Sequence, residues 1–309
     1  MKSKEHALRR KGNELPYHVM MIPGMVVLLI FSVLPMVGIL MAFEYYEPAA
    51  PWFGLKSEWV GLENFITMFF KHPNSQQAIV NTVIIAVSKI IFNLIVPVIF
   101  ALFLNEVLSV RIRRRIQTVV VLPNFLSWVV VGAMFKQGIF GGVGIINNAL
   151  QAVGLISQPI DFISSNIWMR PIVILTDVWK GFGYSAIIYT AAITAIDIGL
   201  YEAAEIDGAN RWQKVIHVTL PGIMPTVILM ATLSLGNVLN AGQDQILNMY
   251  NTTTYQSIDI IDTFVYRIAL REGQFHMGTA LGLAKSVISM VLIIISYKLA
   301  DRFAGYRIF

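Results

Sequence analysis

Apolar stretches of about 20 residues recur along this chain and constrain its fold more than any other feature. A stretch of about that length lets one helix cross the hydrocarbon core of a bilayer. The stretches are continuous and do not alternate between apolar and polar residues, which argues against a membrane β-barrel. Only 13% of the 309 residues are charged, which is about half the share found in a soluble domain. The sequence therefore predicts an all-α polytopic membrane protein.

Six of these stretches predict six transmembrane helices, at about residues 19–43, 78–104, 116–135, 171–196, 221–240 and 278–297. We assign them to one membrane domain, residues 19–300, between an N-terminal tail (1–18) and a C-terminal tail (301–309). The first stretch follows several Lys and Arg residues, as in a secretory signal. Its 25 uncharged residues exceed the apolar region of a signal, so we expect a retained span. Residues 138–166 are rich in Gly, Asn and Ser, and we expect an external loop there with a short interfacial helix at 145–153.

The distribution of Lys and Arg orients these spans. Five lie in the N-terminal tail, four in residues 105–115, two in residues 198–220 and three near the C-terminus, whereas the opposite loops hold six. Because cytoplasmic loops carry the excess of positive charge, both termini and residues 198–220 are predicted to be cytoplasmic. We interpret the basic run at 111–115 as an anchor against anionic membrane lipid, with a specific partner as the alternative.

Several function classes lack their sequence signatures in this chain. It contains no G-x-x-x-x-G-K-[ST], no H-E-x-x-H and no G-x-S-x-G, the motifs of phosphate loops, zinc proteases and serine hydrolases. It contains no cysteine, which excludes disulfides and thiolate metal sites. The net charge of +5 lies mostly in loops and tails, where it sets orientation. We therefore expect no catalytic site, no metal site and no nucleic-acid binding in this chain.

Residues 198–220 are a polar stretch between the fourth and fifth predicted spans. They predict an acidic, alanine-rich half-helix that breaks at Asp207 and Gly208, followed by a second short helix at 211–218. Glycine at the break permits the positive φ of a tight turn. The alanines are small enough to let another protein's backbone approach, and the glutamates stabilise the helix start and can meet arginines on a partner. The stretch is therefore predicted to be a docking surface.

The spacing from Glu202 to Pro221 reads E-A-A, three residues, G, nine residues, V-x-L-P. It resembles the E-A-A-x3-G-x9-I-x-L-P signature of the permease subunits of bacterial binding-protein-dependent ABC importers, with Val218 in place of isoleucine. The resemblance implies the six-helix type I ABC importer permease fold, with a cytoplasmic coupling helix in residues 198–220 that docks into an ATPase subunit. The residues that it assigns to ATPase coupling are Glu202, Ala203, Ala204, Glu205, Asp207, Gly208, Ala209, Arg211, Trp212, Leu220 and Pro221. We expect the last three to tie the loop to the fifth span. The alternative is a solvated amphipathic loop without a partner.

Further stretches look like the sugar-importer permeases, namely LPNFLSW at 122–128, GIIN at 144–147 and WKGFGY at 179–184. Pro16-Tyr17 and WVGLENF at 59–65 fit the branch that takes up polysaccharides and oligosaccharides. This resemblance implies an oligosaccharide cargo that crosses the bacterial cytoplasmic membrane by alternating access. It also implies a heterodimer with a second homologous permease subunit, two ATPase subunits that bind ATP and Mg²⁺, and an extracytoplasmic solute-binding protein.

Four charged residues lie inside predicted spans: Lys89, Asp177, Lys180 and Lys285. An unpaired charge there costs at least a few kcal/mol. Asp177 and Lys180 are three residues apart, so they share a helix face and are placed to pair. They mark either a polar translocation pathway or a structural ion pair. We interpret Lys89 and Lys285 as structural, either in ion pairs between helices or reaching to the membrane surface.

The end of the fifth predicted span combines amides and a carboxylate with nearby Tyr250 and Tyr255. Such groups suit the hydroxyls and ring faces of sugars. The residues predicted to line the substrate pathway are Asp177, Trp179, Lys180, Tyr184, Asn237, Asn240, Gln243 and Asp244. Two other interpretations of the span end stay open: an ordinary polar helix end, or a contact for the external binding protein.

A stand-alone secondary transporter or channel for a polar solute is the alternative function. That class is expected to carry acidic relay residues in its spans and internal repeats. Asp177 is the only carboxylate inside the predicted spans, and we find no repeat. The importer subunit is therefore the favoured hypothesis.

Overall fold

The computed structural model describes residues 15–47, 57–236 and 238–304 of the chain. Within those residues, five helices are long and apolar enough to cross a membrane: Pro16–Phe43, Pro73–Asn105, Asn166–Thr194, Arg211–Gly236 and Phe275–Lys298. A bent pair, Val110–Phe125 and Trp128–Ile139, supplies a sixth span if it crosses as one unit. The all-α membrane architecture is therefore confirmed, and the count of six spans stays a prediction.

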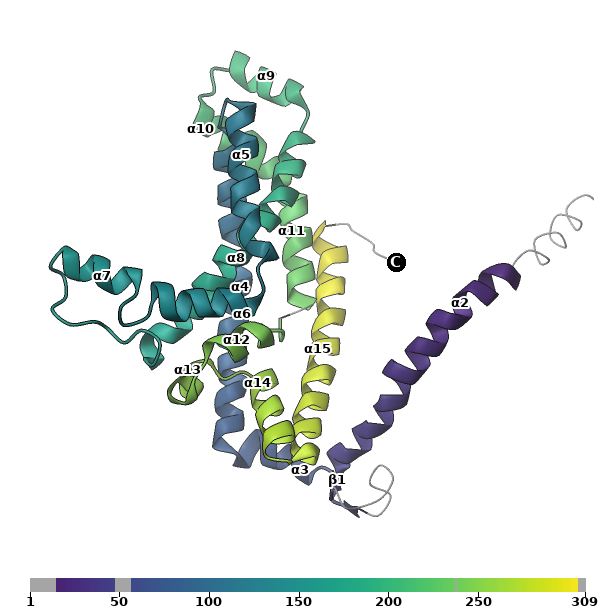
Figure 1. Cartoon of the computed structure of the whole chain (residues 1–309). Coiled ribbons are helices and arrows are strands. Elements are labelled where there is room, and N and C mark those ends of the chain that lie inside the picture. Colours follow the sequence, from purple (N-terminus) through teal and green to yellow (C-terminus); the bar gives the residue numbers. More distant parts are fainter. Residues whose placement is uncertain (1–14, 48–56, 237, 305–309) are drawn as a thin grey trace, which may run out of the picture.

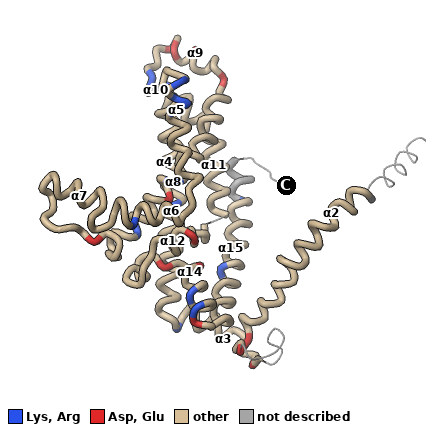
Figure 2. Tube along the Cα trace, in the orientation of Figure 1, with Lys and Arg blue, Asp and Glu red and all other residues tan. Residues whose placement is uncertain are grey.

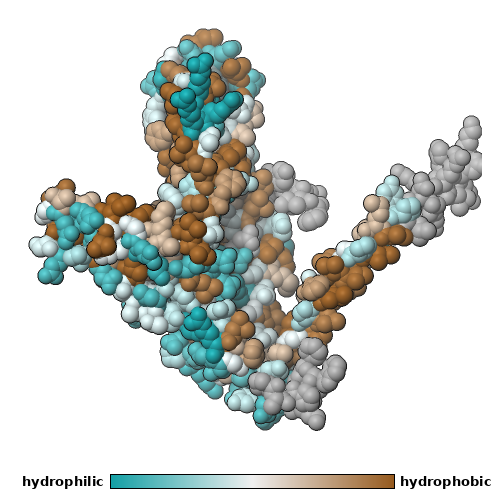
Figure 3. All heavy atoms as spheres, in the orientation of Figure 1, coloured by the Kyte–Doolittle hydropathy of each residue, from teal (hydrophilic) through white to brown (hydrophobic). Residues whose placement is uncertain are grey.

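The apolar stretches of the sequence form long helices, some of which contain irregular turns. Their elements are α2 (Leu15–Leu28), η1 (Leu29–Val33), η2 (Leu34–Phe43), α4 (Pro73–Asn105), α8 (Asn166–Thr194), α11 (Leu220–Gly236) and α15 (Phe275–Ala304). In Figure 1, α4, α8, α11 and α15 form the body of the molecule, and α2 extends away from it. Only 6% of the most apolar window of the first helix is buried inside this chain. Figure 3 shows hydrophobic residues covering most of α2, which leaves that surface for lipid or another subunit.

The third apolar stretch, predicted as a span over 116–135 with Pro123 inside it, is bent in the structure. It consists of α5 (Val110–Val121), η4 (Leu122–Phe125), α6 (Trp128–Ala133) and η5 (Met134–Ile139), with a 95° angle at the break. Pro123 lies in the tight turn before the break, and it has no N–H with which to continue a helical hydrogen-bond ladder. Ser127 then caps the new helix by accepting from the Val130 N–H at 3.4 Å.

The short elements at the end opposite residues 198–220 form a cap of loops and helices around α3 and α14 (Figure 1). They are β1 (Glu44–Tyr45), β2 (Glu58–Trp59), α3 (Glu63–Ile66), η3 (Thr67–Lys71), α12 (Gln243–Met249), η7 (Thr252–Thr254), α13 (Tyr255–Ile258), α14 (Ile261–Tyr266) and η8 (Arg267–Arg271). The two strands pair antiparallel, with Glu44 opposite Trp59. The helix expected at 145–153 is present as α7 (Ile145–Ala152) and projects to one side.

Residues 198–220 fold into α9 (Ile198–Ile206), α10 (Arg211–Lys214) and η6 (Val215–Thr219). The sequence predicted a short second helix at 211–218 that ends before Pro221. In the structure this helix continues through Pro221, and Arg211–Gly236 is one continuous helix. Its π-helical turn lets the Leu220 N–H bond to the Val215 carbonyl. This turn ends at Thr219, and Pro221 lies two residues later within the continuous helix.

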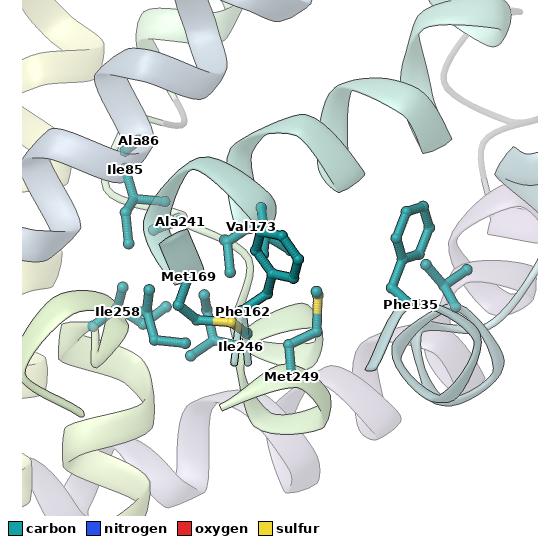
Figure 4. Packing of buried hydrophobic residues seen from close by; sticks show 13 residues of the cluster. Ile85, Ala86, Phe135, Phe162, Met169, Val173, Ala241, Ile246, Met249 and Ile258 are labelled. Atoms are coloured by element: carbon teal, nitrogen blue, oxygen red, sulfur yellow. The ribbon is translucent and has the colours of Figure 1, made fainter. Parts of the chain in front are cut away.

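The largest apolar core lies where α4, α8 and α12 meet. Figure 4 shows Met169 and Val173 of α8 in one cluster with Ile246 and Met249 of α12 and Ile85 of α4. A second cluster joins α4, α8 and α11 nearer to residues 198–220 and includes Tyr189 and Ile223. Because α8 contributes residues to both clusters, it is the central helix of the molecule.

The backbones of α5 and α8 approach each other closely at Gly183, where the two helices cross. A Cβ at Gly183 would lie 2.1 Å from the Val120 carbonyl oxygen. Real Cβ atoms do not come so close to backbone, so the crossing requires glycine.

We predict that Gly183→Ala lowers the thermal unfolding midpoint of the purified protein, because overpacking of this kind costs about 1–3 kcal/mol. Gly181→Ala on the same helix is the matched control, since its Cβ would meet only the Asn93 Oδ1 at 3.7 Å. The control should unfold at or slightly above the wild-type temperature because alanine favours helix. Equal midpoints for the two variants would contradict the close crossing.

Candidate functional site

The hairpin formed by residues 198–220, here called the coupling element, is built by local caps. Asp197 Oδ1 accepts from the Gly199 N–H at 2.9 Å and starts α9. The turn that follows α9 places Gly208 at φ +80°, so the positive φ predicted from the sequence is confirmed. Asn210 and Gln213 then form a reciprocal capping box that starts α10. The element is therefore a defined helix–turn–helix.

Two side-chain contacts hold the halves of the coupling element together. Lys214 Nζ lies 2.7 Å from Glu205 Oε2, and the Tyr201 and Thr219 hydroxyls are 2.9 Å apart. The sequence assigned Glu205 to a partner surface, and the structure gives it this internal partner. The hydrogen bond from Lys214 and then its charge hold the pKa of Glu205 below its ordinary value.

The tip of the coupling element is exposed. Five of the residues assigned to coupling, Glu202, Ala203, Glu205, Asp207 and Gly208, are exposed there, and Ala204 and Ala209 are half-buried. Figure 2 shows acidic positions along α9 and basic positions on α10 and α5. Ile206 is 87% exposed at this tip, and the sequence analysis did not assign it. Its position between two acidic residues in a polar stretch is the sequence feature that indicates an exposed apolar contact.

The base of the coupling element contacts the helices behind it. Trp212 is 64% exposed and lines an apolar groove of about 270 Å³ with Leu102 and Phe103 of α4. It was expected to tie the loop to the fifth span, and it lies at the start of the continuous helix Arg211–Gly236 that forms this span. Arg211 lines the same groove. Leu220 packs in the cluster that joins α4, α8 and α11, whereas Pro221 is exposed.

A polar cavity of about 370 Å³ lies among α4, α8, α11 and the segment after α11. Its polar lining residues are Lys89, Asn93, Asp177, Ser234 and Asn240. The structure thus brings together Asp177 and Asn240, two of the residues predicted for a substrate pathway. Asn93 was not predicted, although an amide inside an apolar stretch is a recognisable signal.

The remaining predicted pathway residues lie in several places. Gln243 and Asp244 are exposed at the start of α12, and Tyr184 is exposed seven residues beyond Asp177 on the same face of α8. Trp179 packs edge-on against Phe135 in the core, with ring centroids 5.2 Å apart. Asn237 lies outside the described residues.

Asp177 pairs with Lys89, so the predicted Asp177–Lys180 pair is wrong. Lys89 Nζ lies 3.1 Å from Asp177 Oδ1, and Asn93 donates to Asp177 Oδ2 at 2.9 Å. Lys180 donates instead to the Asn124 carbonyl at 2.9 Å and lies over the Trp128 ring. The bend after η4 leaves backbone carbonyls without helical partners, and the lysine supplies a donor there.

Lys89 is buried and makes two further contacts. It donates to the Ala241 carbonyl at 2.7 Å and to Gln245 Oε1. Gln245 in turn donates to the Val173 carbonyl at 2.7 Å and to the Thr176 hydroxyl at 2.8 Å. The sequence analysis allowed an ion pair between helices for Lys89, and that is what the structure shows. A buried charge needs such partners to be tolerated.

Lys285 is also paired, with Asp262 of α14. Its ammonium group lies 3.4 Å from Asn240 Oδ1 as well. The interpretation of Lys285 as part of an ion pair between helices is therefore confirmed.

The two tyrosines expected to offer ring faces to a sugar lie together, with ring centroids 5.0 Å apart. The Arg267 guanidinium covers the Tyr255 ring at 4.2 Å and pairs with Asp259. Burial lowers the pKa of Arg267, but the hydrogen bond and charge of Asp259 outweigh it and leave the pKa above its ordinary value. One face of Tyr255 is thus occupied by a permanent cation.

No group of three or more His, Asp or Glu side chains within the described part of the chain is placed to hold a metal ion.

Comparison with known proteins places these features in context. The sequence profile of a family described as binding-protein-dependent transport system inner membrane component matches residues 93–305. The chain is 35% identical over 292 residues to the polygalacturonan/rhamnogalacturonan transport system permease protein YteP of Bacillus subtilis (strain 168), covering 94% of this chain and 89% of that protein. It is 36% identical over 286 residues to protein LplB of the same strain, covering 93% and 88% of the two chains.

A solved structure has the same fold. It is the crystal structure of a bacterial alginate ABC transporter in complex with an alginate pentasaccharide-bound periplasmic protein. One of its chains superposes with a TM-score of 0.86 at 32% identity, covering 97% of this chain and 99% of that one.

We predict that Gly242→Ala destabilises the protein more than Gly273→Ala does. Both glycines have positive φ, at +91° and +75°, so both variants carry backbone strain of about 1–2 kcal/mol. Only at Gly242 would the new Cβ also lie 2.8 Å from Lys89 Nζ, whereas nothing lies within 4 Å at Gly273. Thermal unfolding midpoints measure the difference, and equal losses would show that the Lys89 contact is not tight.

We also predict that Lys214→Gln raises the pKa of Glu205 toward its ordinary value of 4.5. A lowered pKa means that the Glu205–Lys214 pair stabilises the hairpin above pH 4.5 and that this contribution is lost as the pH falls through the folded-state pKa. Carboxyl ¹³C NMR of labelled glutamate measures the pKa, with Glu205→Gln to assign the signal. Arg211→Gln is the control, since it removes a positive charge from the same short helix and keeps the hydrogen bond from Lys214. An unchanged pKa in Lys214→Gln would contradict the pair.

Proposed function

This chain belongs to the family of binding-protein-dependent transport system inner membrane components, and we propose that it carries an oligosaccharide across the bacterial cytoplasmic membrane by alternating access. As a member of this family it is a membrane-spanning, non-catalytic subunit of an ABC importer. The single observation that carries the proposed mechanism is the connection between its two sites. Both helices that leave the coupling element, α8 and α11, line the polar cavity.

In this proposal two ATPase subunits bind ATP and Mg²⁺, and one of them docks on the exposed tip of the coupling element. Glu202, Asp207 and Ile206 offer that partner a mixed acidic and apolar surface. Closure of the ATPases moves the element as a rigid body, because its caps and the Glu205–Lys214 pair fix its shape. The movement passes along α8 and α11 to the cavity wall.

A second, homologous permease subunit completes the channel. The support for this subunit is α2, whose apolar surface is left almost uncovered by the rest of the chain. The cavity is open as well, so another chain is needed to close the pathway around a cargo. Lipid covers the apolar faces that the second subunit leaves free.

The proposed cargo is an oligosaccharide delivered by an extracytoplasmic solute-binding protein. The cavity presents amides, a hydroxyl and a carboxylate, which are the groups that hydrogen-bond sugar hydroxyls. The names of the relatives support the cargo class, since one transports polygalacturonan or rhamnogalacturonan and another belongs to an alginate transporter. The binding protein docks at the end that carries α3, α13 and α14, opposite the coupling element.

The topology follows from the charges. We propose that both termini and the coupling element are cytoplasmic, in agreement with the basic residues on α5 and α10 in Figure 2.

We predict that Gly208→Val abolishes coupling, because a β-branched residue cannot adopt φ +80° without strain. The variant is assembled with the second permease, the ATPases and the binding protein in proteoliposomes and supplied with candidate oligosaccharides. Cargo-stimulated ATP hydrolysis and uptake should both fall at least about tenfold, the effect of about 1.4 kcal/mol.

Gly154→Val is the matched control for this experiment. It has φ +74°, and like Gly208 it has nothing within 4 Å of the added Cβ, but it lies in the loop after α7. It should retain uptake. Normal uptake and stimulated hydrolysis in Gly208→Val would refute the role of the coupling element.

A further inference from the structure

Both helices that leave the coupling element lead to the same buried lysine. α8 ends at Thr194, shortly before α9 begins at Ile198. On the other side, one continuous helix runs from Arg211 to Gly236. Asp177 lies on α8, and Ala241 lies in the segment that follows α11. Lys89 of α4 contacts both residues. α4 is not part of the coupling element, so Lys89 links both moving helices to a third one.

The geometry at Lys89 is closely fitted. Its ammonium group lies 3.1 Å from Asp177 Oδ1 and 2.7 Å from the Ala241 carbonyl oxygen, and it also donates to Gln245 Oε1. The residue is 6% exposed. The neighbouring Gly242 has φ +91°, and a Cβ there would lie 2.8 Å from Lys89 Nζ. The backbone after α11 therefore approaches the ammonium group at a point that only glycine allows.

This junction lies in the wall of the polar cavity. Lys89, Asp177 and Gly242 all line it, and the Asp177 side chain is 23% exposed. A displacement of α8 relative to α11 changes the Asp177 contact and the Ala241 contact of one ammonium group together. Because that group is buried, losing either partner leaves a buried charge or a carbonyl unpaired, which favours joint movement of the two helices.

We infer that Lys89 is a positioning residue that couples movement of α8 and α11 to the shape of the cavity. This inference rests on the proposed function as an importer subunit. In this role Lys89 transmits helix movement between the ATPase side and the cargo side of the subunit. It does not contact ATP. A merely structural lysine would affect assembly and unfolding temperature, whereas a transmitting one affects the link between cargo and ATP hydrolysis.

The test uses the complete importer in nanodiscs, with its ATPase subunits and its cargo-loaded binding protein. Lys89→Met removes the charge and keeps the bulk, and Asp177→Asn removes only the α8 partner of the ion pair. The matched control is Asp262→Asn, because Asp262 is in the other Lys–Asp pair and its side chain is similarly exposed, at 22%. That pair joins α14 to α15, and neither helix leaves the coupling element.

The expected result is a weaker stimulation of ATP hydrolysis by cargo. The ratio of cargo-stimulated to basal ATP hydrolysis should fall by at least about fivefold in Lys89→Met and Asp177→Asn, the lower range for coupled sites. Uptake per ATP hydrolysed should fall with it, while Asp262→Asn keeps the wild-type ratio. Affinity for the binding protein should be unchanged in all three variants.

Wild-type stimulation in both Lys89→Met and Asp177→Asn would overturn the inference, and so would an equal loss in Asp262→Asn. If Lys89→Met does not assemble, the comparison of Asp177→Asn with Asp262→Asn decides the same question. The unmodified importer separates the two claims. Absence of cargo-stimulated hydrolysis and uptake in the wild type refutes the proposed function, whereas normal wild-type activity with normal variants refutes the role of Lys89 alone.

Discussion

A break in a membrane helix frees backbone carbonyls that no water can satisfy, and the rest of this structure depends on how they are paired. At the bend after α5, Lys180 donates to the Asn124 carbonyl. At the break after α11, Lys89 donates to the Ala241 carbonyl. At the end of η2, the Asn64 amide bridges the Ala42 and Glu44 carbonyls. Each of these three sites is therefore held by a polar side chain from another helix.

This way of pairing carbonyls has a mechanical consequence. A carbonyl that accepts a hydrogen bond within its own helix does not connect that helix to its neighbours. A carbonyl that accepts from a side chain of another element holds the two elements together. Lys180 fixes the bend to α8, and Lys89 fixes the segment after α11 to α4 and, through Asp177, to α8. The irregular regions are thus the points at which the long helices are joined. In the proposed mechanism, movement of the coupling element reaches these contacts before it reaches the opposite end of the molecule.

The features predicted well from the sequence were those that depend on neighbours along the chain. Apolar length located the long helices, and motif spacing located the turn at Gly208. Prediction failed where partners are distant in sequence. The bend at 126–127 needs a donor from α8, 56 residues away, and the partner of Asp177 is on α4. Helix periodicity offered Lys180 as the nearest opposite charge, but it carries no information about which helix packs on that face.

The pairing of polar groups in the cavity also bears on how cargo would be handled. Both oxygens of Asp177 are already engaged, one by Lys89 and the other by Asn93. A sugar hydroxyl that binds there must compete with these partners, so each new hydrogen bond replaces an existing one and adds little net free energy. A wall of this kind is suited to passing a cargo and poorly suited to retaining it. In the proposed mechanism, tight and selective binding is therefore the task of the external binding protein, and this subunit supplies a pathway whose shape the coupling element controls.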